Sequence, residues 1–225
     1  MKNNKCWAAA GRMLAAVAVT SIATLMLTTN VWAQHGGSDI PERVKTAWVT
    51  WHTWDGNNPG TVVGTIVTPT QFVTVTYTGE VDFTELENNG INYFRPKSTY
   101  SCPVVINAPS TANMIAISGT PETHTLSFSP PIKNPVIAIV SLGGGSLSVG
   151  YKFSAKPAIL VQGRGKYYGG GDDRLQIVDE TTLEGTEGDG LIQFTGRFGS
   201  ISWTVEASEY WNGFTVGFPP VHPKN

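Results

Sequence analysis

The sequence of 225 residues predicts an all-β protein, folded as an antiparallel β-sandwich or jelly roll of roughly 11–12 strands. Apolar residues alternate with polar ones in short stretches, a pattern typical of strands that bury one face. Turns rich in glycine, asparagine or proline separate these stretches at intervals of ~8–15 residues. Strands do not alternate with helical segments, so a parallel nucleotide-binding sheet is excluded.

Residues 1–33 have the features of a secretory signal peptide. An apolar run at residues 14–27 is preceded by three basic residues and followed by Val-Trp-Ala at residues 31–33, which fits a signal-peptidase site. We therefore expect cleavage after Ala33, secretion or release into the periplasm, and no stable membrane insertion of the mature chain. An uncleaved membrane anchor is the alternative that the sequence leaves open.

The mature chain is predicted to be a single domain. Residues 34–43 are polar and contain two glycines, which predicts a flexible N-terminus. Residues 44–218 are expected to form the β-sandwich domain, and residues 219–225 a C-terminal tail.

The alternation identifies individual strands. Residues 70–77 place Val73, Val75 and Tyr77 on one face and threonines on the other. The same pattern occurs at residues 147–153, 201–205 and 214–218. Two stretches are continuously apolar and therefore predict central strands, residues 135–142 and 158–161. Residues 83–88 are the one expected helical turn.

The charge and the cysteine content restrict the function. Residues 1–33 hold three of the 15 basic residues and none of the 17 acidic ones, so the mature chain has 12 basic residues and a net charge of −5. A mildly acidic surface with no basic cluster is therefore expected, which argues against nucleic-acid binding and against docking to anionic lipid. The single cysteine of the mature chain, Cys102, precedes an apolar run and is expected to be a buried thiol rather than a reactive one.

Four segments of the second half resemble a known family: residues 134–143 (NPVIAIVSLG), 185–196 (GTEGDGLIQFTG), 200–204 (SISWT) and 209–217 (EYWNGFTVG). Over about residues 124–218, the chain resembles the β-sandwich domain of secreted bacterial proteins of the PEP-CTERM, exosortase-sorted class. The resemblance implies a cell-surface or matrix role and brings no catalytic residues. Residues 218–225 lack the sorting tail of that class, so we expect free secretion or the periplasm instead of surface sorting.

Three tryptophans near the mature N-terminus are candidates for stacking on sugar rings: Trp48, Trp51 and Trp54. In an extended strand, Trp48 and Trp54 would share one face with His52, and Trp51 would lie on the other. At least one indole is then expected on the surface, where a flat ring could bind a polysaccharide. The alternative is that all three are core residues.

A glycine-rich acidic region is the candidate metal site. Asp172, Asp173, Glu187 and Asp189 are the residues that we would assign to calcium, because carboxylates and flexible backbone carbonyls supply the oxygens that calcium needs. The spacing is not that of an EF-hand, and solvated turn acids are the alternative. The four histidines are scattered, and the chain contains no nucleophile elbow, so a zinc centre or a serine hydrolase is not indicated.

These observations predict a secreted, non-catalytic extracellular or matrix protein that acts by binding or by self-assembly. Self-assembly could use residues 34–43 as a donor strand for the open sheet edge of another copy. Expected partners are therefore the protein itself, other matrix components or a polysaccharide. A carbohydrate-binding module is the first alternative, and a polysaccharide-active enzyme with two converging acids is the second.

Overall fold

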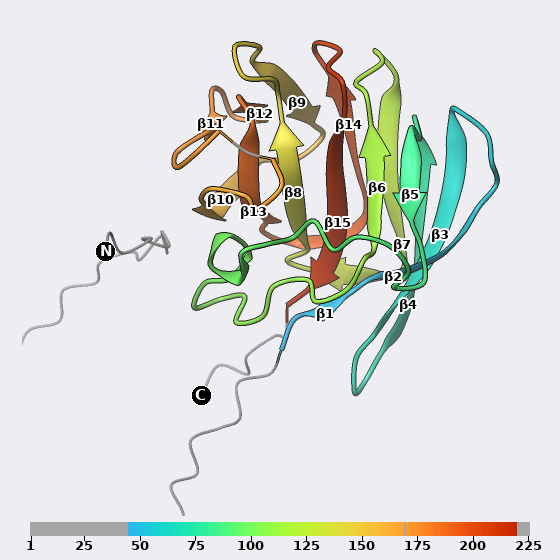
Figure 1. Cartoon of the computed structure of the whole chain (residues 1–225). Helices are drawn as coiled ribbons and strands as arrows, with labels where there is room; N and C mark the ends of the chain where they lie inside the picture. The colour runs from blue at the N-terminus through green and yellow to red at the C-terminus, as the bar shows by residue number, and fades with distance from the viewer. Residues whose placement is uncertain (1–44, 169, 220–225) are drawn as a thin grey trace, which may run out of the picture. The chain divides into compact units, whose positions relative to one another are not determined.

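The computed structural model describes residues 45–168 and 170–219, which form two antiparallel sheets packed as a β-sandwich (Figure 1). Sheet A has the order β10-β13-β8-β15-β6-β5, with β1 also paired to β15, and sheet B has the order β11-β12-β9-β14-β7-β4-β3-β2. The predicted all-β sandwich is confirmed. The predicted signal peptide, the predicted flexible segment 34–43 and most of the predicted tail lie outside the described residues.

The strands of sheet A are β1 (Ala47–Trp48), β5 (Phe83–Glu85), β6 (Met114–Ile117), β8 (Val136–Leu142), β10 (Pro157–Gln162), β13 (Gly188–Phe194) and β15 (Asn212–Phe218). Those of sheet B are β2 (Thr50–Trp54), β3 (Gly60–Val67), β4 (Phe72–Gly79), β7 (Thr123–Lys133), β9 (Val149–Phe153), β11 (Leu175–Ile177), β12 (Thr182–Gly185) and β14 (Arg197–Val205). A short 3-10 helix, η1 (Lys97–Tyr100), lies between β5 and β6.

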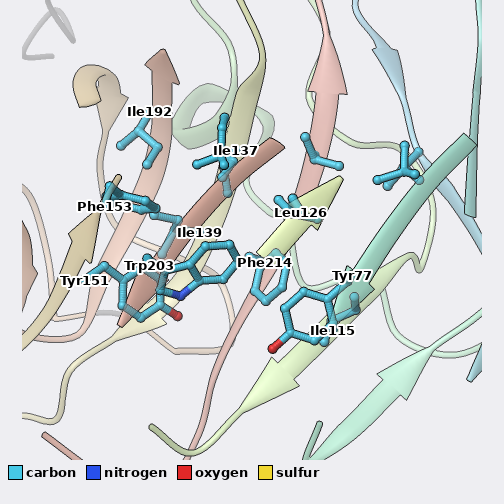
Figure 2. Packing of buried hydrophobic residues seen from close by; sticks show 14 of the residues in the cluster. Tyr77, Ile115, Leu126, Ile137, Ile139, Tyr151, Phe153, Ile192, Trp203 and Phe214 are labelled. Carbon is cyan, nitrogen blue, oxygen red and sulfur yellow. The ribbon is translucent and has the colours of Figure 1, made fainter. Parts of the chain in front are cut away.

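The main core fills the space between the two sheets. Trp203 of β14 occupies its centre, and the indole contacts Phe214 of β15 edge-on with ring centroids 5.3 Å apart (Figure 2). Tyr77 of β4 packs against both rings. The alternation in β4 and β14 therefore buries the residues that the sequence predicted, because the other face of sheet B is exposed to water.

Sheet A is buried on both faces, which is why β8 is continuously apolar. Ile137 and Ile139 point into the main core, whereas Val136, Ala138 and Val140 belong to a second apolar cluster. Phe94 and Tyr100 complete this second cluster, and they come from the long segment between β5 and β6. Figure 1 shows that segment in green, crossing in front of sheet A. It acts as a third layer over the outer face of the sheet.

Several sequence expectations differ from the structure. The described residues contain 15 strands instead of 11 or 12, because two- to four-residue strands carry too little alternation to be recognised. Residues 83–88 begin with strand β5 and do not form a helical turn, and the 3-10 helix lies at Lys97–Tyr100. Residues 158–161 belong to β10, an edge strand, whose apolar residues Leu160 and Val161 face the second cluster. Leu147 is 41% exposed and precedes β9.

Within the part of the chain that the structure describes, no helix has the length and apolar character needed to cross a membrane.

Phe214→Ala should strongly destabilise the protein, because the ring is fully buried between the sheets. We expect the free energy of unfolding to fall by about 3–5 kcal/mol, the usual cost of removing a buried phenylalanine. Tyr210→Ala is the matched control, since Tyr210 is 91% exposed, and it should change the value by less than about 0.5 kcal/mol. Chemical unfolding followed by tryptophan fluorescence measures both, and equal effects would contradict the assignment of this core.

Candidate functional site

Two loops lie together on the outer face of sheet A. One is the segment between β5 and β6, and the other joins β10 to β11. The backbone N–H of Lys166 donates to the carbonyl of Arg95 at 2.7 Å, and the hydroxyl of Thr99 donates to the carbonyl of Arg164 at 3.0 Å. These hydrogen bonds fix residues that are about 70 positions apart in the sequence.

Five aromatic side chains gather where these loops meet the start of β15, and we call them the aromatic surface: Phe83, Tyr93, Tyr167, Tyr168 and Trp211. The Trp211 ring lies 5.4 Å from that of Tyr93 and 5.0 Å from that of Tyr168, both edge-on. Tyr167 and Tyr168 remain 44% and 46% exposed. Clustered aromatic rings that stay half in water are typical of a binding surface.

Charged groups border the aromatic surface. The ammonium of Lys166 lies 4.9 Å from the ring centroid of Tyr167, a cation–π contact. Burial, followed by the nearby Glu85 carboxylate, raises the pKa of Tyr93. The Tyr93 hydroxyl therefore keeps its proton to a higher pH than an ordinary tyrosine.

Carboxyl groups lie directly below the loop that carries Tyr168. Asp189 sits at an irregularity in the pairing of β13 with β8, and its Oδ1 accepts hydrogen bonds from the Tyr100 hydroxyl at 2.7 Å and the Ser141 N–H at 3.3 Å. The Ser141 hydroxyl donates to Glu187 at 2.8 Å. Ser141 therefore connects the two acids of the segment 185–190.

Asp189 is 1% exposed, and its Oδ2 has no hydrogen-bond partner. Burial raises the pKa of its carboxyl to about 7, despite the hydrogen bonds from Tyr100 and Ser141, which lower it. A Cβ at Gly165 would lie 2.2 Å from the backbone oxygen of Tyr168 and 2.8 Å from Oδ2 of Asp189. Only glycine fits between the tyrosine loop and this buried acid.

Glu209 connects the same region to Trp211. Its Oε1 accepts hydrogen bonds from the Gly143 N–H at 2.9 Å and the Asn212 side chain at 2.8 Å. Asn212 in turn accepts from the buried Tyr151 hydroxyl. Burial, with a smaller contribution from the charge of Glu187, raises the pKa of Glu209 to about 7, despite the hydrogen bonds from Gly143 and Asn212, which lower it. Glu209 thus joins the start of β15, next to Trp211, to the end of β8.

A separate buried polar group lies in sheet B. The Tyr77 hydroxyl donates to the carbonyl of Glu80 at 2.6 Å and lies 2.8 Å from Nδ1 of His124, which must then carry the proton. His124 also stacks on Trp203, and burial lowers its pKa to about 4. A neutral imidazole held between two rings is a core residue and does not face the candidate site.

The three tryptophans predicted to stack on sugars occupy different environments. Trp51 is fully buried in the main core, so it has no surface to offer a ligand. Trp54 is partly buried against that same core, because a register irregularity between Trp51 and Thr53 interrupts the expected alternation. Trp48 packs on the second cluster and donates to the carbonyl of Asn107 at 3.0 Å. The prediction that Trp48 and Trp54 share a face opposite Trp51 is wrong.

The four predicted calcium ligands are placed in two different settings. Asp172 and Asp173 are exposed on the loop between β10 and β11, whereas Glu187 and Asp189 are bound to Ser141. The alternative that these are solvated turn acids does not hold for Asp189, which is buried. Within residues 45–168 and 170–219, no group of three or more His, Cys, Asp or Glu side chains is arranged to hold a metal ion.

Cys102 is half-buried against the second cluster and is a free thiol.

Sequence reasoning missed the aromatic surface as a site. The signals were present, because Tyr167-Tyr168 stands between glycine turns and Trp211 lies in the segment that resembles the secreted family. Tyr93 comes from a third, remote segment, so only the fold shows that these rings meet.

A comparison of the chain with family models, with curated proteins and with solved structures finds no match. The residues of the aromatic surface and the acids below it are therefore the basis of the functional argument.

Asp189→Asn should change how stability depends on pH. Between its ordinary pKa of 3.8 and about 7, folded Asp189 keeps a proton that the unfolded chain has lost. The native free energy of unfolding therefore falls as the pH rises through this window, and the asparagine variant lacks this loss. The free energy of unfolding of the variant minus that of the native protein should therefore be larger at pH 8 than at pH 5.

Guanidinium chloride unfolding at both pH values measures this difference. Asp172→Asn is the control, because Asp172 is exposed, and its stability relative to the native protein should not change with pH. His124 contributes an opposite trend below pH 6.5 in both proteins and cancels in the comparison. An Asp189→Asn difference that is the same at pH 5 and pH 8 would contradict the assignment.

Proposed function

We propose that this protein is a secreted, non-catalytic β-sandwich protein that binds an extracellular polysaccharide with its aromatic surface. The observation that carries the proposal is the contact of Tyr93, Tyr168 and Trp211, with Tyr167 and Tyr168 each left about half exposed. Flat rings stack on the C–H faces of sugars, and neighbouring hydroxyl and charged groups bond the sugar hydroxyls. The signal peptide predicted at residues 1–33 and the resemblance to secreted surface proteins support an extracellular ligand.

The surrounding carboxyl groups support binding over catalysis. A glycosidase needs two carboxyl groups that reach the scissile bond from either side. Asp189 is buried under Gly165, and Glu187 and Glu209 are held by Ser141 and Gly143. Asp189 anchors the segment between β5 and β6 through Tyr100, and Glu209 anchors the start of β15 through Asn212, which are positioning roles.

Self-assembly is the second candidate, favoured by a feature of sheet B. Its edge strand β11 ends at Ile177, which is 37% exposed, and Val178 follows with 48% of its surface exposed. The Gln162 side chain bonds the outer backbone groups of Leu175, which leaves the edge open at Ile177. An open strand edge with an apolar side chain can pair with another chain. A donor strand from residues 34–43 stays a prediction, because these residues lie outside the described part.

Replacing Tyr167 and Tyr168 together by alanine should weaken polysaccharide binding. Each ring contact contributes about 0.5–1.5 kcal/mol, so we expect the double variant to lose affinity by about 5- to 150-fold. Phe72→Ala is the control, because Phe72 is 60% exposed at the start of β4 in the other sheet. Affinity electrophoresis of the purified protein through gels containing neutral or acidic polysaccharides gives the affinities.

Light scattering on the same samples reports self-association. A double variant that binds every polymer as the native protein does would reject the aromatic surface. Native protein that binds no polymer and instead forms oligomers would favour the assembly candidate.

A further inference from the structure

Basic residues concentrate beside the aromatic surface. Arg95, Lys97, Arg164 and Lys166 lie on the two loops that the hydrogen bonds of Lys166 and Thr99 join. All four side chains are exposed. They are four of the 12 basic residues of the mature chain, on a protein whose predicted mature charge is −5.

These cations form no ion pair with a carboxylate of the described residues. Among the described residues, one ion pair has its nitrogen and oxygen within 4.0 Å of each other. It joins His52 of β2 to Glu87, which follows β5, at 3.9 Å. Lys166 instead lies over the ring of Tyr167. Unpaired cations grouped next to aromatic rings leave a local positive potential that a negative ligand can neutralise.

The acids of this region occupy other positions. Asp189 lies below the loop, and Glu187 and Glu209 are bound through Ser141 and Gly143 beside β8. Glu85 lies near Tyr93 on the side of β5. Asp172 and Asp173 are exposed further along the loop between β10 and β11, and among the described residues no carboxylate lies within 4.0 Å of a lysine or arginine nitrogen. Residues 95–97 and 164–167 therefore group four cations on this part of the surface.

We propose that the polysaccharide is anionic, a uronic-acid polymer whose rings stack on Tyr167 and Tyr168 while its carboxylates pair with Arg95, Arg164 and Lys166. This inference rests on the proposed function. Planar guanidinium groups bind carboxylates in a bidentate manner, which suits two arginines beside a stacking surface. Duplex DNA carries one negative charge per ~1.7 Å, whereas a uronic-acid polymer carries one per sugar ring and so has a lower charge density. The rest of the domain is net negative, and it would therefore repel DNA more strongly than the sugar polymer.

The test compares two triple variants with the same change in charge. R95Q/R164Q/K166Q removes three cations of the proposed site, and K133Q/K156Q/R197Q removes three exposed cations elsewhere. Affinity electrophoresis with polygalacturonate as the acidic probe and dextran as the neutral probe gives the affinities at 50 mM and 500 mM salt. The site variant should lose most of its affinity for polygalacturonate, and the control should keep it.

Salt provides the second readout. With three ion contacts, native affinity for polygalacturonate should fall by about a hundredfold between the two salt concentrations, and the site variant should lose this dependence. If dextran binds as tightly as polygalacturonate and the site variant is unaffected, the acidic class is wrong although polysaccharide binding stands. If neither polymer binds, both proposals fail. Tighter binding of a DNA duplex than of polygalacturonate would overturn the inference in favour of nucleic acid.

Discussion

Burial of both faces of sheet A is the constraint on which the rest of the structure depends. Strand β8 carries apolar side chains toward the main core and toward the outside, and the outward ones must be covered. Sheet B covers one face with Trp203 and its neighbouring rings, as Figure 2 shows. The segment between β5 and β6 covers the other face, with Phe94 and Tyr100 as its anchors. The outer layer therefore follows from the composition of one strand.

The candidate site is a consequence of how this outer layer is attached. Tyr100 reaches through the layer to Asp189, and Gly165 allows the neighbouring loop to pass directly above that acid. Tyr168 is placed next to Trp211 by this arrangement. The exposed residues of the loop between β10 and β11 include tyrosines, arginines and lysines, so the loop has few apolar contacts to hold it in place. Burial of the Asp189 carboxyl is unfavourable, but it accompanies the close packing of this loop at Gly165.

Local patterns predicted the sandwich but not the site. Alternation located Val73, Val75 and Tyr77 correctly, since the two-residue period depends only on neighbours in the sequence. It failed at Trp54, where an extra residue in β2 reverses the faces, and a bulge leaves no mark in composition. The burial of Asp189 and the proximity of Arg95 to Lys166 depend on contacts between remote segments. The predicted mature charge of −5 likewise gives no sign of the local group of cations on the two loops.

The central claim, that polysaccharide binds the aromatic surface, is tested most directly by a nuclear magnetic resonance titration. The purified protein, labelled with 15N, would be titrated with oligogalacturonate while the tryptophan indole signals are followed. Binding at the proposed place should shift the Trp211 indole and the Tyr167 and Tyr168 amides, and leave the buried indoles of Trp51 and Trp203 unchanged. Shifts centred on Trp54 and β3, with none at Trp211, would contradict the account.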